Sequence, residues 1–462
     1  MFDCSKEFDS FYKNHVRLSA KEKSELHDKR KKNLKRLKKG LIKYNEEKGT
    51  DYKFVDDRTQ GSMAMHTIVQ NDEKDYDIDV AIIFDSENLG DLGAQATRKM
   101  VSDAINREMS QFSQEPEVKT GCVRVRYTTG YHIDFAIFKR SKDYEWQEEY
   151  NYEYAGSEWS IRDIKALDNW FANETRTKTD DLRKVVRLSK MFCKSRDDWG
   201  AMPSGLAQTL LCSEQFDSSR SRIDEKFYHT LKAVENRLQY NLSVNAPSDV
   251  DNGRLITTRQ VDLDKMARWR DKLSNQLQKL DVLFESDCTY KEAISAWEDF
   301  FNHKYWTDLS NTAVQMSESL ESLAMYDYKD TEEFIENIYP VAEIYSVDID
   351  CRVSSDGFRE TSLYDYLARN IRGFSKVIPF NFKVKCKVGS TNCPSYDKVL
   401  WKVRNVGEVA KKKDCIRGQI KERANEIIEP TSFEGTHFIE CYLIKNDVCV
   451  AIGHVDVPIG QD

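Results

Sequence analysis

A chain of 462 residues is too long for one small module and suggests about three domains at roughly 150 residues each. With 40% hydrophobic and 32% charged residues it can bury real cores, and only 19 Gly and 8 Pro exclude collagen-like and linker-rich architectures. The formal charge of −8, from 70 basic and 78 acidic residues, argues against broad affinity for nucleic-acid backbones.

Targeting and redox signals favour a cytoplasmic protein. No stretch approaches the roughly 18 apolar residues of a membrane-spanning helix, and the start MFDCSKEFDSFYKN lacks the apolar core of a secretory signal. The 11 cysteines run from Cys4 to Cys449 without a CxxC pair. We therefore expect reduced, mostly buried thiols, with neither a disulfide framework nor a structural zinc site.

The first strong pattern is a basic stripe at residues 29–43, KRKKNLKRLKKGLIK. Leu34, Leu37, Leu41 and Tyr44 recur at spacings of three and four, which predicts an amphipathic helix whose apolar face packs on the next domain. The lysines and arginines would then form a solvated outer face. The alternative is a surface for nucleic acid or nucleotide phosphates.

Residues 52–145 change to short strands and turns, YKFV, YDIDVAIIF, CVRVRYTTG and YHIDFAIFK, with a helix near 93–112. From 146 to 330 helical periodicity dominates, as in DDLRKVVRLSKMFCKS. After about 375 the pattern becomes strand-like again. NFKVKCKV and KVLWKVRNV are followed by the pair HFIECYLI and VCVAIGHVDVPI, which a short turn at 445–447 separates.

Two carboxylates share one face of the predicted strand DYDIDVAIIF. Asp77 and Asp79 take that face and Ile78 and Val80 the other, because strand side chains repeat every two residues. An isolated DxD has little specificity and is usually a pair of solvated acids. Here the surrounding strand is apolar, where adjacent like charges are costly unless a cation neutralises them.

Two further motifs surround this strand. In QGSMAMHT, Gly61 and Ser62 form a turn before a short predicted helix, which offers backbone N–H groups and a hydroxyl to a phosphate chain. In YHIDFAIFK, Asp134 shares a strand face with His132 and Ala136. A Gly-Ser turn, a DxD strand and a later Asp provide the oxygen ligands that two-magnesium nucleotidyl transfer requires.

This combination resembles the polymerase-β-like nucleotidyltransferases, and more closely the CD-NTases, bacterial relatives of cyclic GMP-AMP synthase and oligoadenylate synthetase. Their pattern runs GS, DYDIDV and HIDF, and EWSIRDIKALDNWF at 158–171 resembles the segment after their third acid. The resemblance implies an α+β fold, a polymerase-β-like core with a mixed sheet and a helical second lobe. It assigns catalysis and metal binding to the three acids and nucleotide binding to the turn, that is, to Asp77, Asp79, Asp134, Gly61 and Ser62.

In these families a helical lysine and a helix-start serine hold the triphosphate, and the resemblance carries those roles to Lys190 and Ser204. Arg183, Arg187 and Lys190 lie at i, i+4 and i+7 on one face of LRKVVRLSK. Whether the two arginines form an exposed helix face or also serve the site stays open. His66 stands where many relatives have glycine.

His132 neighbours a proposed metal ligand, and we expect it to orient or pack against its neighbours rather than to bind the metal.

Residues 340–462 resemble the β-rich, sandwich-like sensor domain found fused to adenylyl/guanylyl cyclases and to these synthases. The match lies in VLWKVRNVGEVAKKKDCIRGQI and GTHFIECYLIKNDVCVAI. A set of polar and aromatic residues there forms either a ligand pocket or a domain interface: Trp401, Arg404, Asn405, Glu408, Arg417 and Gly418. The implied domains are a catalytic core at 1–145, a helical lobe at 146–330 and the sensor at 340–462.

The resemblance implies an enzyme that joins ATP and other nucleoside triphosphates into a cyclic di- or trinucleotide with two Mg²⁺ ions, or Mn²⁺. Such enzymes act in bacterial antiphage (CBASS) signalling, where the product activates a separate effector. The alternatives are a synthase of linear 2′-5′ oligonucleotides, an RNA or protein nucleotidyltransferase, and a non-catalytic nucleotide-binding module. No Cys/His cluster stands where the animal relative has its DNA-reading zinc insertion, so we expect no activation by DNA.

Overall fold

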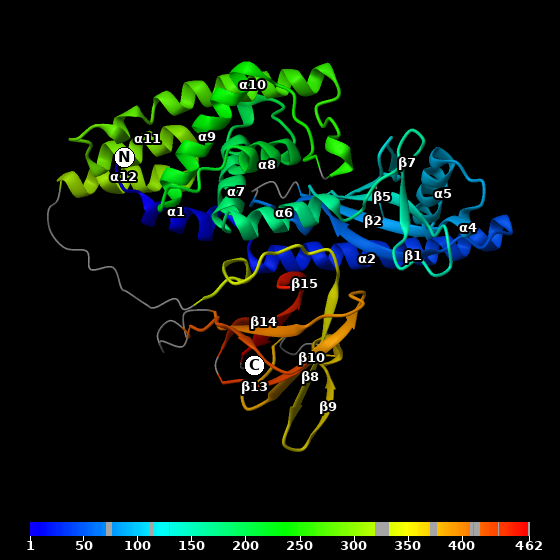
Figure 1. Ribbon diagram of the computed structural model, residues 1–462. Coiled ribbons are helices and arrows are strands. Elements are labelled where there is room, and N and C mark those ends of the chain that lie inside the picture. The colour runs from blue at the N-terminus through cyan, green and yellow to red at the C-terminus, as the bar shows by residue number, and fades with distance from the viewer. Residues whose placement is uncertain are drawn as a thin grey trace. The chain divides into compact units, whose positions relative to one another are not determined.

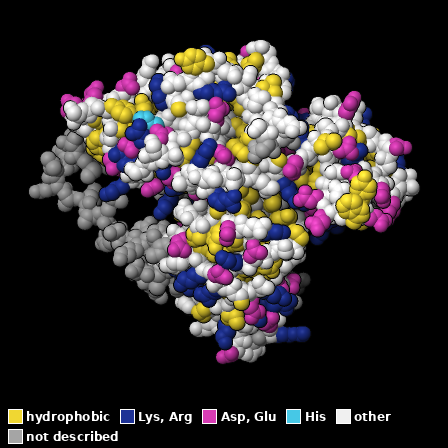
Figure 2. All heavy atoms as spheres, viewed as in Figure 1, with side chains coloured by type: hydrophobic (Ala, Val, Ile, Leu, Met, Phe, Trp, Pro, Cys, Tyr) yellow, Lys and Arg dark blue, Asp and Glu magenta, His cyan; other side chains and the backbone are white. Residues whose placement is uncertain are grey.

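The structure of the protein is a computed structural model (Figure 1). It describes residues 1–70, 76–110, 112, 114–128, 130–248, 250–318, 332–369, 377–406, 410, 416–432 and 434–460. The chain divides into two compact units, residues 1–322 and 323–462. None of the described helices has the length and apolar character needed to cross a membrane. Basic and acidic side chains are interspersed over the face seen in Figure 2.

A seven-stranded mixed sheet forms one half of the first unit. Its main path is β1 (Phe54–Gln60), β2 (Asp77–Asp85), β5 (His132–Ser141), β4 (Val123–Arg126) and β3 (Glu117–Val118). β6 (Asn151–Ala155) pairs with β5, and β7 (Trp159–Ile161) pairs with β6. β2 and β5 are parallel and every other pair in this sheet is antiparallel. The expected α+β class with a mixed sheet is confirmed.

Two long helices, α2 (Ala20–Lys48) and α5 (Ala94–Asn106), pack against this sheet and share its apolar core. The predicted apolar stripe of α2 is buried, with Leu34, Leu37 and Leu41 at most 7% exposed, while Lys32 and Lys35 on its outer face are exposed. A capping box from Ser19 and Glu22 begins the helix. Most of the basic stripe is thus the outer face of a packed helix, but Arg30 is 3% exposed and forms an ion pair with Asp57.

The other half of the first unit is a helical lobe. It contains α1 (Ser5–Phe11), α6 (Ala166–Thr177), α7 (Asp181–Lys194), α8 (Gly205–Glu214), α9 (Ile223–Tyr240), α10 (Gln260–Gln278), α11 (Tyr290–Phe301) and α12 (Lys304–Glu318). Its core is strongly aromatic: Phe8 of α1 lies 4.6 Å from Trp297 and 5.5 Å from Trp306, ring centre to ring centre. Among these helices α6, α7 and α8 lie nearest the sheet (Figure 1).

Two features of this unit were not expected. The sheet extends beyond residue 145, because β6 and β7 belong to it. The first helix packs in the core of the helical lobe rather than on the sheet. The sequence assigned residues 1–16 to the catalytic core, but Phe8 and Phe11 of this segment are completely buried among lobe residues. The domain boundary at residue 145 stays a proposal.

The second unit holds two four-stranded antiparallel sheets. One contains β13 (Glu426–Pro430), β10 (Lys383–Thr391), β8 (Val347–Ser355) and β9 (Phe358–Ser362), and α13 (Leu363–Arg369) follows β9. The other contains β12 (Ile420–Glu422), β11 (Lys398–Arg404), β14 (Gly435–Lys445) and β15 (Val448–Ile459). The predicted terminal hairpin is confirmed, with Asn446 and Asp447 at φ 50° and 55° in its turn.

One disulfide bond, Cys351–Cys386, departs from the expected set of reduced thiols. The two cysteines lie directly opposite each other on β8 and β10, with Cα atoms 4.2 Å apart. This pairing follows from the register of strands that are distant in sequence, which cysteine spacing does not reveal. Cys4, Cys122, Cys193, Cys212, Cys288 and Cys393 are free.

Candidate active site

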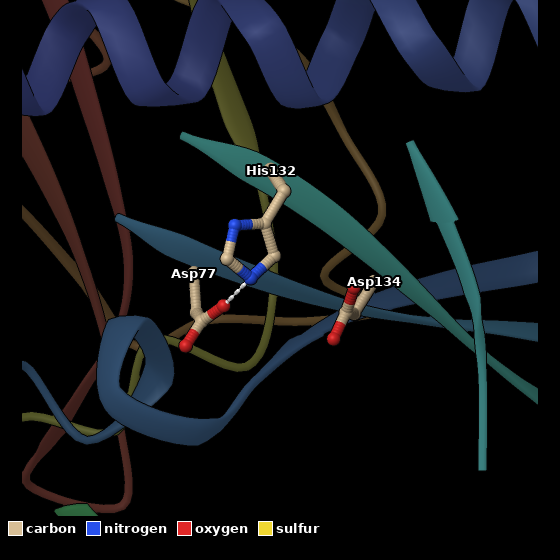
Figure 3. A group of neighbouring side chains, drawn as sticks. All are labelled: Asp77, His132 and Asp134. Atoms are coloured by element: carbon tan, nitrogen blue, oxygen red, sulfur yellow. Dashed lines mark ion pairs between the residues drawn. The ribbon is translucent and has the colours of Figure 1, made fainter. Parts of the chain in front are cut away.

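The register of the two parallel strands brings the predicted acids together. Asp77 on β2 lies opposite His132 on β5, and Asp79 lies opposite Asp134. Figure 3 shows His132 turned toward Asp77, with which it forms an ion-pair contact. Donor atoms of Asp77, His132 and Asp134 lie within 4.8 Å of one another. These three side chains could therefore hold one metal ion.

The Gly-Ser turn lies directly against the second acid. Gly61 begins the four-residue helix α3 (Gly61–Ala64) at φ 65°, a conformation that glycine adopts without strain. A Cβ built on Gly61 would lie 2.2 Å from Oδ2 of Asp79. Gln60 pairs with Asp79 across β1 and β2, so the strand register sets this contact. The predicted turn and the DxD strand thus form one surface.

The carboxylates affect one another. Burial, together with the nearby charges of Asp77 and Asp134, raises the pKa of Asp79 to about 7. Burial alone would raise the pKa of Asp77, but the side chains of His132 and Arg124 face its carboxylate and lower the pKa overall. A cluster of acids with this degree of mutual repulsion is the kind of site that a divalent cation stabilises.

Arg124 is a site residue that the sequence analysis missed. Its Nε and Nη2 donate to the two oxygens of Asp134 at 2.7 and 2.5 Å, and Nη2 lies 3.5 Å from Oδ1 of Asp77. β4 pairs with β5 so that Arg124 is directly opposite Asp134. The available signal was the alternation in CVRVRYTTG, but using it required the register of the β4–β5 hairpin.

The basic side chains of α7 contact three consecutive residues that follow α3. Arg183 Nε donates to the carbonyl of Met65 at 3.2 Å, and Arg187 Nη2 donates to the carbonyl of His66. Lys190 Nζ donates to Oγ1 of Thr67 at 2.7 Å.

The two arginines are 0% and 2% exposed, which excludes an exposed helix face for Arg183 and Arg187. Lys190 lines the cavity described below. Burial, reinforced by the charges of Arg187 and Lys194, lowers the pKa of Lys190 to about 7. A polyanion beside Lys190 would restore its charge.

His66 has φ 57°, in the left-handed region that glycine favours. The ring of His66 is buried and its Nε2 lies 3.1 Å from Nζ of Lys23 on α2. The turn therefore keeps its geometry without a glycine because its neighbours hold it.

Ser204 is placed less directly. It caps α8, accepting a hydrogen bond from the backbone N–H of Ala207 at 3.2 Å. Its neighbours Pro203 and Gly205 line the cavity but Ser204 does not, within the described residues. A Cβ on Gly205 would lie 3.3 Å from Nζ of Lys190, so the start of α8 is close to the lysine.

A cavity of about 760 Å³ joins these groups. Its walls include the turn, the three acids and the lysine: Gly61, Ser62, Asp77, Asp79, Asp134 and Lys190. Asp168, in the first turn of α6, also lines it and is 4% exposed. Burial and the charge of Asp79 raise the pKa of Asp168 well above its usual value. The sequence analysis quoted this segment without assigning Asp168 a role.

The residues singled out in the sensor segment make contacts within the second unit. Trp401 Nε1 donates to the carbonyl of Ala424 at 2.9 Å, and Arg404 Nη2 lies 3.2 Å from Oε2 of Glu332. Arg417 forms an ion pair with Glu429. The backbone N–H of Asn405 donates to the carbonyl of Arg417. Glu408 lies outside the described residues, and the choice between a ligand pocket and an interface stays open.

Comparison with known proteins identifies both parts of the chain. Residues 55–138 match the Cyclic GMP-AMP synthase DncV-like nucleotidyltransferase domain, and residues 329–460 match the Adenylyl/Guanylyl and SMODS C-terminal sensor domain. The chain thus carries a nucleotidyltransferase domain that matches the DncV-like family and a C-terminal domain that matches the sensor family. The nucleotidyltransferase match covers β1, β2 and β5, the strands that carry the turn and all three acids.

The chain is also similar to individual proteins of known name or structure. It is 23% identical to a cyclic GMP-AMP synthase of Escherichia albertii over 418 residues, which cover 87% of this chain and 83% of the relative. A structure of the Vibrio cholerae di-nucleotide cyclase DncV in complex with ATP and GTP has a TM-score of 0.50 at 16% identity. It covers 63% of this chain and 92% of its own. E. coli CdnC with ATP has a TM-score of 0.47 at 15% identity and covers 65% and 98%.

The donor set of this nucleotidyltransferase fits a divalent metal. Two aspartates offer hard oxygen ligands and one histidine a nitrogen ligand. The position of His132 allows either role that a histidine takes beside a metal, as a ligand or as the group that orients a ligand. Its contact with Asp77 is consistent with the orienting role expected from the sequence.

Proposed function

We propose that this nucleotidyltransferase joins ribonucleoside triphosphates into a cyclic di- or trinucleotide second messenger and releases pyrophosphate. The observation that carries the proposal is the strand register that places Asp77, Asp79 and Asp134 at one cavity with the Gly-Ser turn and Lys190. The E. albertii relative that aligns over most of the chain is a cyclic GMP-AMP synthase, which supports a cyclic product.

Each residue has a distinct role in this proposal. Asp77, Asp79 and Asp134 hold two Mg²⁺ ions, which supply neutralisation of the triphosphate and activation of the attacking hydroxyl when bound. The backbone N–H groups and hydroxyl of Gly61 and Ser62 bind the β and γ phosphates.

Lys190, and Ser204 at the start of α8, hold the same triphosphate from the helical lobe. The acceptor hydroxyl attacks the α-phosphorus in line with the departing pyrophosphate, and positioning with charge neutralisation supplies most of the rate.

The proposal extends to the cellular setting and to regulation by the second unit. We propose that the enzyme acts in the bacterial cytoplasm in antiphage (CBASS) signalling, that its product activates a separate effector, and that the sensor domain binds the ligand that regulates synthesis. Support comes from the match of residues 329–460 to a sensor domain.

The test is product analysis with labelled ATP, GTP, CTP and UTP in Mg²⁺, followed by phosphatase. A phosphatase-resistant product that needs Asp77 and Asp79 would support a cyclase, and the labels required would identify its bases. The Asp77→Asn/Asp79→Asn variant should abolish it, while Asp91→Asn, an exposed acid outside the cavity wall, should not. Products that phosphatase degrades would instead indicate linear oligonucleotides, and labelled RNA or protein would indicate transfer to a macromolecule.

Magnesium-independent nucleotide binding without pyrophosphate release would reduce the chain to a binding module.

A further inference from the structure

The segment after the Gly-Ser turn is held from the helical lobe by two arginines that do not line the cavity. Arg183 and Arg187 are 0% and 2% exposed, and neither is in the cavity wall formed by described residues. Both donate to main-chain carbonyls, those of Met65 and His66. Burying two charged guanidinium groups costs free energy, so their contacts with a loop of only three residues require an explanation beyond packing.

We infer that Arg183 and Arg187 are positioning residues that set the shape of the triphosphate-binding turn from the helical lobe. The inference rests on the proposed function, because it assigns the turn to the β and γ phosphates. It gives a role to the two arginines whose function the sequence left open. It also distinguishes them from Lys190, which follows on the same helix face but lines the cavity itself.

The path from the arginines to the turn is short and consists of hydrogen bonds. The backbone N–H of Met65 donates to the carbonyl of Gly61 at 3.0 Å, and that of Thr67 donates to the carbonyl of Ser62 at 2.7 Å. Residues 65–67 are therefore tied at one side to the turn and at the other to α7. A shift of the carbonyls that the arginines hold would be transmitted to Gly61 and Ser62.

The backbone of this segment needs such support. His66 has φ 57°, which is unfavourable for a residue with a Cβ. Arg187 holds the carbonyl of this residue, while its Nη1 donates to the hydroxyl of Tyr12. Strained backbone persists where surrounding contacts over-determine it, and such contacts are typical of ligand-binding sites.

The guanidinium group suits this task better than an ammonium. Arg183 uses separate nitrogens for Met65, for the carboxylate of Asp180 and for the hydroxyl of Thr175. Its planar fork is thereby fixed in orientation as well as position. Lysine could satisfy one carbonyl but would leave the remaining partners without a donor. We therefore expect affinity for a triphosphate to be highest in the wild type, lower in the Lys variant and lowest in the Met variant.

The test compares binding of a triphosphate with binding of a monophosphate. Calorimetry with α,β-methylene ATP and with AMP in Mg²⁺ measures how much the β and γ phosphates add to affinity. We expect Arg187→Met and Arg183→Met to weaken binding of the ATP analogue about tenfold, the effect of one lost charge-assisted contact. AMP binding should be unchanged, and Arg187→Lys should recover part of the loss.

Arg98→Met is the matched control. Arg98 is 4% exposed and likewise donates to two carbonyls, those of Ala155 and Gly156, which are not among the described residues of the cavity wall. Arg98→Met should lower the melting temperature about as much as Arg183→Met and Arg187→Met do. It should leave the ratio of the affinities for the ATP analogue and AMP unchanged. The double variant His66→Gly/Arg187→Met should regain affinity for the ATP analogue, because glycine at residue 66 needs less support.

An unchanged affinity ratio in both arginine variants, with a loss of melting temperature like that of Arg98→Met, would overturn the inference alone. A wild-type protein that binds the ATP analogue no better than AMP and releases no pyrophosphate from ATP would overturn the proposed function as well. If Arg187→Met does not fold, Arg187→Lys and Arg183→Met still decide, since weaker binding of the ATP analogue with unchanged AMP binding is expected only from a positioning role.

Discussion

Gly61 and Asp79 are in contact so close that a single methyl group on residue 61 would come within 2.2 Å of the Asp79 carboxylate. The Gly-Ser turn and the second acid can share a cavity wall only because residue 61 has no side chain.

Gly61→Ala should therefore reduce activity at least about tenfold, since misplacing a reacting group by about 1 Å costs that much or more. Gly49→Ala is the matched control. Both glycines have φ 65°, but nothing lies within 4 Å of a Cβ on Gly49. Each variant should lose about 1 kcal/mol of unfolding free energy from backbone strain. Pyrophosphate release measures the activity, and urea unfolding measures the free energy of unfolding. Equal activity in the two variants would mean that the Asp79 contact is unimportant.

Both oxygens of the Asp134 carboxylate accept hydrogen bonds from Arg124, so a cation that binds Asp134 must compete with Arg124. Arg124→Gln should therefore increase affinity for Mn²⁺ by about tenfold, because it removes a positive charge from beside the metal site. Electron paramagnetic resonance of free Mn²⁺ measures this without catalysis. Arg126→Gln, which removes a charge paired with Glu117 two residues along the same strand, should change affinity little. Weaker Mn²⁺ binding by Arg124→Gln would show that Arg124 organises the carboxylates instead.

His66 offers a direct measure of backbone strain. Alanine and glycine at residue 66 both remove the ring and its contact with Lys23, but only alanine keeps a Cβ at φ 57°. His66→Gly should be more stable than His66→Ala by about 1 kcal/mol. This is opposite to the usual order, in which glycine costs more conformational entropy. Urea denaturation of the two variants checks it, and a more stable alanine variant would contradict the assigned turn.

The second unit contains a histidine, His454, whose titration should change the stability of this unit in a defined direction. Burial alone would lower the pKa of His454, but hydrogen bonds to Asp456 and Glu440 raise this pKa to about 9 from an ordinary 6.5. Its ring nitrogens lie 3.4 Å from Glu440 and 3.1 Å from Asp456. A raised folded pKa means that the stabilisation is complete below pH 6.5 and is lost as the pH rises through 9. It amounts to at most about 3 kcal/mol.

His454→Gln should remove this dependence. Hydrogen exchange of β14 and β15 amides between pH 6 and 10, corrected for intrinsic rates, would follow the local stability of the second unit. Wild type should lose protection over this range more steeply than the variant. Equal slopes would show that the charge of His454 does not stabilise the hairpin.

The sequence predicted the parts of the site that depend on local periodicity. Alternation along two strands was enough to place Asp77 and Asp79 on one face and Asp134 on another strand, and the DncV-like match supports the core that holds them. Helical spacing likewise placed Lys190 on one face with the arginines. In each case the relevant period, two or 3.6 residues, is a property of the backbone itself.

What the sequence did not reveal depends on contacts between distant segments. The pairing of Arg124 with Asp134 needs the register of a hairpin, and the carbonyls that Arg183 and Arg187 hold belong to a loop more than 100 residues earlier. β6 pairs with residues 138–141 of β5, beyond the part of β5 that pairs with β4, so its place in the sheet also depends on contacts between separate segments. The disulfide bond between Cys351 and Cys386 has the same origin.

The packing of the first helix among the last helices of its unit has a consequence for synthesis. The ring of Phe8 packs against Trp297 and Trp306, which leave the ribosome long after it. At about 5–20 residues per second, tens of seconds pass between the two events. During that interval α1 has no aromatic partners from α11 and α12, while the sheet that carries the acids is already complete. The newborn chain therefore exposes Phe8 and Phe11 during this interval, and the core of the helical lobe is completed only near the end of translation of the first unit.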